Sequence, residues 1–153
     1  MSIPNRTLLR LLVVEDDTDD QLLVLDALRE ASVPHDVYFA HDGAELMAYI
    51  NREGEHADPS TSPLPHLVIL DLHMPRLSGF EVLEKRRENP VFRLIPVIVM
   101  SSSWSEEDIA RCYTLGVNSF ITKPVSFDHL VRVMRTIGTY WLEVCELPDL
   151  HRA

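Results

Sequence analysis

In the stretch HLVILDLHMPRLSG (residues 66–79), an apolar run ends abruptly in a carboxylate. The run 66–71 is short and rich in branched side chains, which is typical of a strand buried on both faces. Ser78 and Gly79 then open a segment whose apolar residues have helical spacing. The stretch therefore predicts a strand and a helix, with Asp71 at the carboxyl end of the strand. A charge at that place is costly through desolvation and requires an explanation.

The same alternation of strand and helix patterns runs along the whole chain. We predict strands at 8–14, 35–40, 66–71, 96–101 and 118–123, and helices at about 18–31, 43–52, 79–88, 106–115 and 127–145. Asp42, Ser78, Ser105 and Ser126 stand where N-cap residues are expected. Five strands alternating with five helices predict an α/β fold, a doubly wound parallel sheet covered on both faces. The polar segment 53–65 is expected to form a long surface loop.

Composition narrows the class of protein. The chain has 153 residues, 46% hydrophobic and 25% charged, which fits one globular domain with a full core. A net charge of −10 argues against nucleic acid as a partner, because phosphate binding needs an excess of Lys and Arg. No apolar run is long enough to span a membrane, and no signal peptide is evident, so we expect no membrane association and a cytoplasmic location. Cys112 and Cys145 are expected to be free thiols.

Polar side chains collect at the predicted strand ends. In open parallel sheets, ligands bind beyond the carboxyl ends of the strands. Those ends carry Glu15 and Asp16 (followed by Asp17), Asp71, Ser101 and Lys123. Each residue alone would be an ordinary turn or cap residue, so the prediction rests on their joint placement on one rim. The next acids, in the segment 18–20, are interpreted as a solvated first helical turn.

The chemistry of this set points to phosphoryl transfer. Two carboxylates about 4 Å apart repel by about 4 kcal/mol at an effective dielectric near 20, so protons or a cation must relieve the cluster. Oxygen ligands favour Mg²⁺, which commonly binds carboxylates together with a phosphate oxygen. Lys123 and Ser101 supply a positive charge and a hydrogen-bond donor for an anion. Asp71 can then act as a nucleophile and become an aspartyl phosphate, which explains a charge at that place.

Four motifs in this order resemble the receiver domain of two-component response regulators. They are LLVVEDD (11–17), LVILDLHMPRLSG (67–79), PVIVMSS (96–102) and FITKP (120–124). The separations also match, with 30 residues from Asp71 to Ser101 and 22 from Ser101 to Lys123. The resemblance covers residues 7–145 as one receiver domain, with 1–6 and 146–153 as terminal tails, and we expect no output domain.

The resemblance implies a fold and a role for each matching residue. The fold is flavodoxin-like, with strand order 2-1-3-4-5. The implied metal ligands are Asp16, Asp71, the backbone carbonyl of His73, and Glu15 through water. Ser101 and Lys123 would bind the phosphoryl group, Phe120 would be an aromatic switch, and the Lys123–Pro124 bond would be cis. The cofactor implied is Mg²⁺, and the protein would be a phospho-accepting signalling protein rather than an enzyme. The imidazole of His73 is expected to influence the lifetime of the phosphate.

Further segments narrow the subgroup and the partners. The stretches VPHDVYFAHDGAELMAYI (33–50) and YWLEVCELP (140–148) resemble single-domain regulators paired with phytochrome-type photoreceptor kinases of bacteria. The implied partner is a sensor histidine kinase of that type or a phosphotransfer protein. Phosphorylation would alter the face built from the fourth helix, fifth strand and fifth helix. Val133, Tyr140 and Leu142 lie off the main apolar stripe of the last helix, so we expect a homodimer through this face.

Two other functions remain open from the sequence. A metal-dependent phosphohydrolase on a related sheet needs a second acid two residues after the nucleophile, and His73 occupies that position. A degenerate receiver that serves only as a binding module would not need Glu15, Asp16, Asp71, Ser101 and Lys123 together. Both alternatives are therefore less favoured than a phospho-accepting module.

Overall fold

The computed structural model describes residues 7–102 and 104–150, and these form a three-layer α/β domain. The strands are β1 (Leu9–Val14), β2 (His35–Ala40), β3 (Leu67–Leu70), β4 (Val97–Ser101) and β5 (Ser119–Thr122). The helices are α1 (Thr18–Glu30), α2 (Gly43–Ile50), α3 (Gly79–Glu88), α4 (Glu106–Thr114) and α5 (Phe127–Gly138). Short 3-10 turns, η1 (Gly54–His56) and η2 (Phe92–Leu94), precede β3 and β4.

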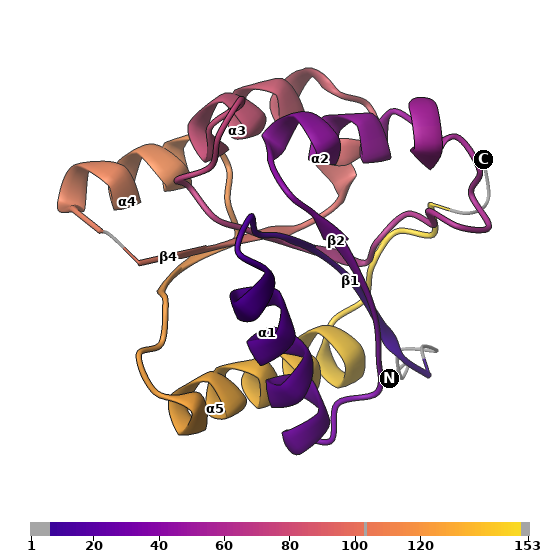
Figure 1. Cartoon of the computed structure of the whole chain (residues 1–153). Coiled ribbons are helices and arrows are strands. Elements are labelled where there is room, and N and C mark those ends of the chain that lie inside the picture. The colour runs from indigo at the N-terminus through magenta and orange to yellow at the C-terminus, as the bar shows by residue number, and fades with distance from the viewer. Residues whose placement is uncertain (1–6, 103, 151–153) are drawn as a thin grey trace.

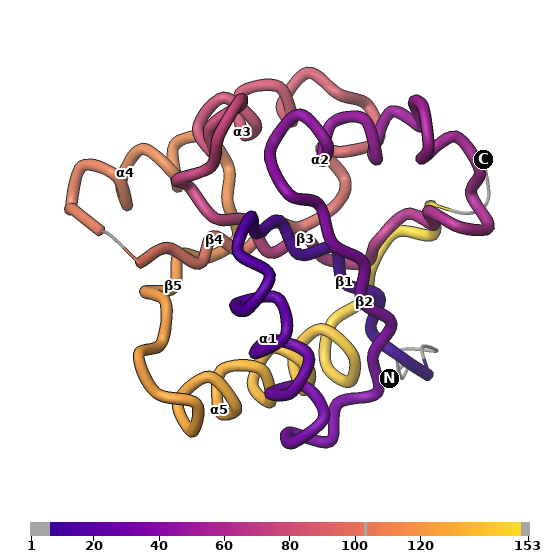
Figure 2. Tube along the Cα trace, in the orientation of Figure 1, coloured from indigo at the N-terminus to yellow at the C-terminus, as the bar shows by residue number. Residues whose placement is uncertain are grey.

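All paired strands run parallel, in the order β2-β1-β3-β4-β5. Helices α1 and α5 cover one face of the sheet, and α2, α3 and α4 cover the other (Figures 1 and 2). The predicted doubly wound fold and its strand order are confirmed. Because the chain leaves β1 toward β2 and later returns to β3 on the other side, the strand order reverses beside β1, where such sheets bind ligands.

Alternate side chains of each central strand enter two separate cores. Leu12 and Val14 of β1 pack with α2, α3 and α4, while Leu11 and Val13 pack with α1 and α5. All four are almost fully buried. Strands buried on both faces hold their ends rigidly, so residues that follow them are fixed in position.

The predicted helix starts are confirmed by side-chain caps. Asp42, Ser78, Ser105 and Ser126 each accept a hydrogen bond from the backbone N–H three residues later. These bonds satisfy N–H groups that have no partner within the helix, which fixes where each helix begins.

Some element ends differ from the prediction. Helix α2 ends at Ile50 rather than 52, because Arg52 adopts a left-handed conformation (φ 56°) and turns the chain away. The last helix was predicted to continue to 145, but its regular α-helical part ends at Gly138. A π-helical turn, η3 (Thr139–Val144), follows.

The loop 53–65 is anchored rather than freely exposed. The Tyr49 hydroxyl donates to the Pro63 carbonyl (2.7 Å), and the His56 Nδ1 and Ser62 Oγ atoms lie 2.9 Å apart. Ser62 and Leu64 are buried. The prediction of a surface loop was therefore right about its length and wrong about its packing.

Three further expectations, on Leu142, on the Lys123–Pro124 bond and on the terminal tails, differ in part from the structure. Leu142 was assigned to an exposed face but is 8% exposed and belongs to the core on the α1–α5 side. No cis peptide bond occurs in the described part of the chain, so the Lys123–Pro124 bond is trans. The predicted tail 1–6, and residues 151–153 of the predicted tail 146–153, lie outside the described residues, whereas Leu150 of that second tail packs against the core on the α2–α4 side. Within the described ranges, no helix is both long and apolar enough to cross a bilayer.

Candidate functional site

The carboxyl edge of the sheet brings the predicted site residues together. Val14 pairs with Leu70 across β1 and β3, so the residues that follow them, Glu15 and Asp71, are neighbours. The Asp71 N–H donates to the Val14 carbonyl (3.3 Å), which continues the ladder to the nucleophile candidate itself. Two central strands thus fix two carboxylates at one place.

A second pair of strands supplies the remaining groups. Ser101 pairs with Thr122 at the ends of β4 and β5. The Lys123 N–H donates to the Ser101 carbonyl (2.8 Å), which ties the base of the lysine to the strand beside β3. The Ser101 side chain is fully buried. These contacts place the hydroxyl and the ammonium on the same edge as the acids.

Three carboxylates form a cluster suited to a cation. Ligand oxygens of Glu15, Asp16 and Asp71 all lie within 4.8 Å of one another. The Glu15 side chain is 8% exposed and that of Asp71 is 12% exposed, whereas Asp16 is open to solvent. Hard oxygen ligands of this kind, with one open side, suit a divalent cation that retains some of its water.

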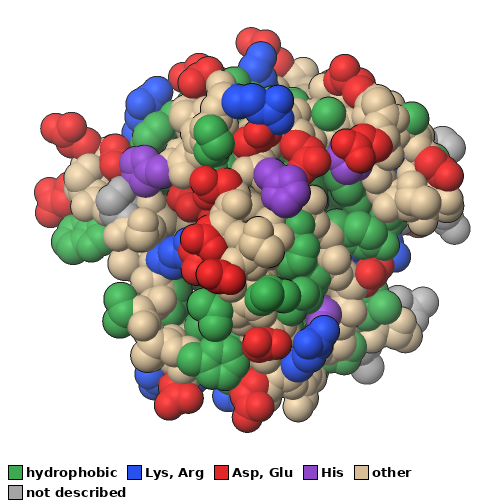
Figure 3. Space-filling view, viewed as in Figure 1, with side chains coloured by type: hydrophobic (Ala, Val, Ile, Leu, Met, Phe, Trp, Pro, Cys, Tyr) green, Lys and Arg blue, Asp and Glu red, His purple; other side chains and the backbone are tan. Residues whose placement is uncertain are grey.

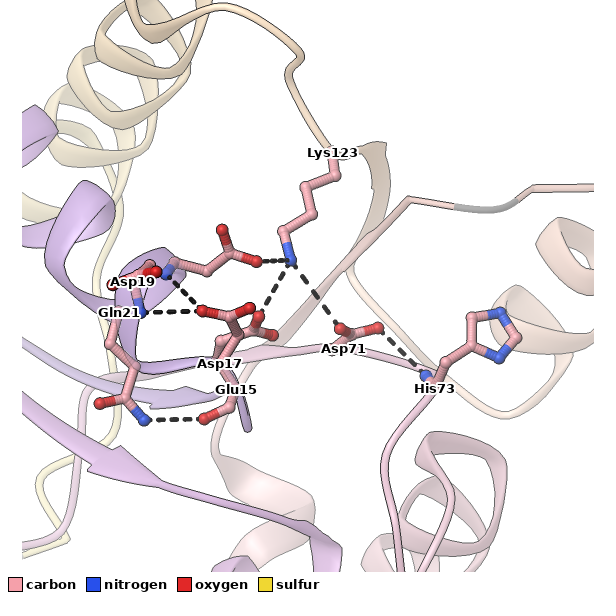
Figure 4. A network of polar contacts seen from close by, with 8 residues as sticks. Glu15, Asp17, Asp19, Gln21, Asp71, His73 and Lys123 are labelled. Atoms are coloured by element: carbon pink, nitrogen blue, oxygen red, sulfur yellow. Dashed lines mark hydrogen bonds and ion pairs between the residues drawn. The ribbon is translucent and has the colours of Figure 1, made fainter.

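Lys123 lies between carboxylates on three elements (Figure 4). Its Nζ is 3.1 Å from Glu15 Oε1, 2.9 Å from Asp20 Oδ2 and 4.0 Å from Asp71 Oδ2. Burial lowers the pKa of Lys123, but its hydrogen bonds to Asp20 and Glu15 outweigh burial, and the net shift is upward. The amine is therefore held in its charged form, as an anion-binding group must be.

The cluster is electrostatically strained when no cation is bound. Burial raises the pKa of Glu15 to about 8, and its contacts with Asp20 and Asp71 act in the same direction, while Lys123 opposes them. Placing the buried Glu15 carboxylate beside two other carboxylates without a counter-charge is unfavourable, which favours its protonated form. A cation would replace that proton, which is the relief expected from the sequence.

Asp20 belongs to this site, and its assignment to a solvated helical turn was wrong. Asp17 caps α1 and accepts hydrogen bonds from the N–H groups of Asp19 (2.8 Å) and Asp20 (3.2 Å). The cap turns the Asp20 side chain toward Lys123, whereas Asp19 is exposed. Burial raises the pKa of Asp20, but the hydrogen bonds to Lys123 and Glu15 outweigh it and leave that pKa lowered.

The loop between β3 and α3 shapes the other side of Asp71. The His73 N–H donates to Asp71 Oδ1 (3.0 Å), while the exposed imidazole lies on the side of Asp71 away from Lys123 (Figure 4). Arg76, with φ 65°, donates from Nε to Asp42 Oδ2 (2.6 Å). A Cβ at Gly79 would lie 2.7 Å from the Leu72 Cα, so only glycine permits this loop to fold back so closely.

The aromatic residue predicted to act as a switch lies on the edge strand. Phe120 is half-buried and packs against the core on the α2–α4 side. Its N–H donates to the Tyr113 hydroxyl of α4 (3.2 Å). Phe120 is thus in contact with α4 through its backbone as well as with the core.

The site opens on an acidic surface. Figure 3 shows acidic side chains gathered where α1 begins, with a basic side chain beside them. The exposed acids of this segment are Asp16, Asp17 and Asp19. The electrostatic field here favours cations, so an anion needs a cation and Lys123 to enter.

Comparisons with known proteins agree with this geometry. A family model described as the response regulator receiver domain matches residues 11–135. The response regulator Rcp1 of Synechocystis sp. is 36% identical over 138 residues, which are 90% of this chain and 92% of Rcp1. The phosphorylated cyanobacterial phytochrome response regulator RcpA has a TM-score of 0.84 and 38% identity, covering 94% of this chain and 100% of that one. The Mn²⁺-bound form of Rcp1 has a TM-score of 0.81 and 35% identity, covering 92% and 99%.

Proposed function

Because the chain belongs to the response regulator receiver family, we propose that it accepts a phosphoryl group on Asp71 from the phosphohistidine of a kinase or phosphotransfer protein. The observation that carries this proposal is the position of Asp71. Its carboxylate has oxygen atoms within 4.8 Å of ligand oxygens of Glu15 and Asp16, and Asp71 Oδ2 lies 4.0 Å from Lys123 Nζ. A carboxylate nucleophile beside both a candidate cation site and an ammonium is suited to phosphoryl transfer.

The proposed metal ligands are Glu15, Asp16, Asp71 and the backbone carbonyl of His73. The clustering of three carboxylates supports this ligand set, and the pKa of Glu15, which burial raises, supports a counter-charge at the same place. Mg²⁺ is the proposed ion, and the Mn²⁺-bound form of Rcp1 is a relative with a divalent cation. When bound, the ion would neutralise negative charge on the phosphoryl oxygens during transfer.

In the proposed reaction, a carboxylate oxygen of Asp71 attacks phosphorus and forms a new P–O bond. The P–N bond of the phosphohistidine breaks, and its electron pair remains on the leaving imidazole nitrogen. The product is an aspartyl phosphate, a mixed anhydride, on a chain that performs no net catalytic turnover. Lys123 and the Ser101 hydroxyl are the groups proposed to hold the phosphoryl oxygens.

The signal is proposed to leave through the face built from α4, β5 and α5. Movement of Ser101 toward the phosphoryl group would open space for Phe120, whose contact with Tyr113 links it to α4. Residues 7–145 are proposed to form the receiver domain that carries this signal. In η3, which follows α5, Tyr140 is 50% exposed and meets Trp141 edge-on, with ring centroids 5.1 Å apart.

We also propose that this face supports a homodimer. A shallow groove of about 350 Å³ is lined by Ile121, Val133 and Ile137, among others. Gel filtration with light scattering, with and without beryllofluoride and Mg²⁺, is the test. A monomer under both conditions would remove the dimer from the proposal.

A phytochrome-type histidine kinase is the proposed donor. This rests on the similarity to RcpA, a cyanobacterial phytochrome response regulator, over nearly the whole chain. Transfer of radiolabelled phosphate from a purified phytochrome kinase, compared with transfer from a kinase of another sensor class at equal concentration, would test it. Equal rates from both kinases would contradict this choice of partner.

Incubation with acetyl phosphate and Mg²⁺, followed by intact-mass measurement, tests the function itself. The expected result is one phosphoryl adduct per chain. Steady hydrolysis of the donor without an adduct would instead indicate a phosphohydrolase. The absence of both an adduct and donor hydrolysis would indicate a binding module.

A further inference from the structure

Lys123 is held by two acids rather than by the nucleophile. Its Nζ donates to Asp20 Oδ2 (2.9 Å) and Glu15 Oε1 (3.1 Å). The 4.0 Å to Asp71 is too long for a hydrogen bond. An ammonium group has three protons, so two are directed to Asp20 and Glu15.

The position of Asp20 is set by the local structure of α1. The Asp17 cap fixes the backbone of the first turn through Asp19 and Asp20. One residue later, the Gln21 amide donates to the Glu15 carbonyl (2.8 Å) and ties the same turn to the end of β1. Contacts on both sides therefore hold Asp20 near Lys123.

The surroundings strengthen the ion pair. Asp20 and Lys123 side chains are 36% and 26% exposed. They border a small cavity of about 30 Å³ whose wall includes Val24 and Met100. An apolar wall excludes water, so each charge is less screened on that side.

Asp20 differs in role from the other carboxylates. Glu15, Asp16 and Asp71 form the cluster that could share a cation, whereas Asp20 is not part of that cluster, pairs with Lys123 and lies beside Glu15. An anion at Asp71 would have to attract Lys123 away from Asp20 and would be repelled by its carboxylate. A dication at the cluster would be attracted by the same charge.

We propose that Asp20 is a positioning residue that competes with the phosphoryl group for Lys123, weakening the phosphorylated state while strengthening cation binding. This inference rests on the proposed function of Asp71. It identifies Asp20 as a residue that tunes the balance between phosphorylated and unphosphorylated protein, through the lysine and not through contact with the reacting atoms.

The test compares Asp20→Asn with Asp19→Asn in the full chain. Both variants lose one acid from the same helical turn, so their effects on the helix dipole and on the general field are matched. Calorimetry measures the affinity for Mg²⁺ alone, and then for beryllofluoride, a phosphoryl mimic, at saturating Mg²⁺. Asp20→Glu, which keeps the charge, serves as the rescue variant.

Relative to Asp19→Asn, we expect Asp20→Asn to bind beryllofluoride about fivefold more tightly and Mg²⁺ about threefold more weakly. Asp20→Glu should lie close to the wild type. Simple destabilisation of the fold would weaken both affinities, so opposite signs are specific to the proposed competition.

Two results would overturn the inference. Equal affinities in Asp20→Asn and Asp19→Asn would show that the contact with Lys123 has no effect on either ligand. Weaker beryllofluoride binding in Asp20→Asn would show that Asp20 presents the lysine to the anion. A wild type that bound no beryllofluoride and formed no acetyl phosphate adduct would remove the proposed function, and the inference with it.

Discussion

Lys123 and Arg86 are both largely withdrawn from solvent, but their partners differ in kind. Lys123 lies among the carboxylates of Glu15, Asp20 and Asp71. Arg86, on α3, donates from Nε and Nη2 to the Ile95 carbonyl (3.1 and 2.8 Å) and from Nη1 to the Gly116 carbonyl (3.1 Å). One cation contacts charged side chains, whereas the other contacts neutral backbone.

The difference distinguishes a cation whose partners can be exchanged from one whose partners are fixed. Backbone carbonyls cannot leave, so Arg86 fastens α3 to the segments before β4 and β5, and its guanidinium lies 5.8 Å from the Phe92 ring centroid. The carboxylates around Lys123 can be exchanged for phosphoryl oxygens, because another anion offers the same interaction. A buried cation with exchangeable partners is therefore the one that can take part in a reaction.

Replacing Lys123 should have the largest effect. In Lys123→Met we expect adduct formation from acetyl phosphate to slow by about a hundredfold or more, because the positive charge facing the phosphoryl group is lost. Intact-mass time courses measure this rate. Lys85→Met, at an exposed position on α3, is the control, and equal rates in the two variants would contradict the role of Lys123.

Replacing Arg86 should instead affect stability. Arg86→Met leaves the carbonyls of Ile95 and Gly116 without these donors, at a cost of about 2–4 kcal/mol in the free energy of unfolding. Urea denaturation measures this cost, with the exposed neighbour in Arg87→Met as control. The amount of phosphoryl adduct formed per folded molecule should be unchanged. A loss of adduct without a loss of stability would contradict a purely structural role for Arg86.

The excess of carboxylates around Lys123 predicts that the stability of the metal-free protein depends on pH. Glu15 has a pKa of about 8 in the folded chain and an ordinary value of 4.5, so the folded state binds more protons between these values. Stability in EDTA should therefore fall as the pH rises from about 5 to about 8. Glu15→Gln should show a smaller fall.

Mg²⁺ should reduce the same dependence, because the cation replaces the proton as the counter-charge. Urea midpoints at both ends of the pH range, in EDTA and in Mg²⁺, provide the measurement. If, in EDTA, the free energy of unfolding of the wild type rose from about pH 5 to about pH 8 relative to that of Glu15→Gln, the raised pKa assigned to Glu15 would be contradicted.

The smallest effect is expected at His73. Its backbone N–H donates to Asp71 Oδ1, and its imidazole is directed away from Lys123 (Figure 4). We expect His73→Ala to change the half-life of the phosphorylated protein by about threefold, a modest effect typical of a group near but outside the reacting atoms. Equal rates of phosphate loss in variant and wild type would end this role.

The sheet and the rim could be predicted because they depend on local patterns. Apolar runs identify the strands, and parallel strands bring their carboxyl ends to one edge, which placed Asp71 beside Glu15. The caps at Asp42 and Ser78 follow from side-chain chemistry within three residues. These features need no knowledge of how distant elements pack.

The contribution of Asp20 could not be predicted for the opposite reason. Asp19 and Asp20 are identical in type and adjacent in sequence, and which one meets Lys123 depends on how the first turn of α1 is held against the ends of β1 and β5. Leu142 was misplaced similarly, because the course of the chain after Gly138 depends on packing. The anchoring of loop 53–65 through Tyr49 is a contact that composition does not reveal.

Locating the phosphoryl group in the chain tests the central claim most directly. After labelling with acetyl phosphate and Mg²⁺, borohydride reduction converts an aspartyl phosphate to homoserine, which peptide mass spectrometry identifies by position. We predict homoserine at residue 71 and none in Asp71→Asn. Homoserine at another acid, or label retained on a serine or histidine with residue 71 unchanged, would contradict the account.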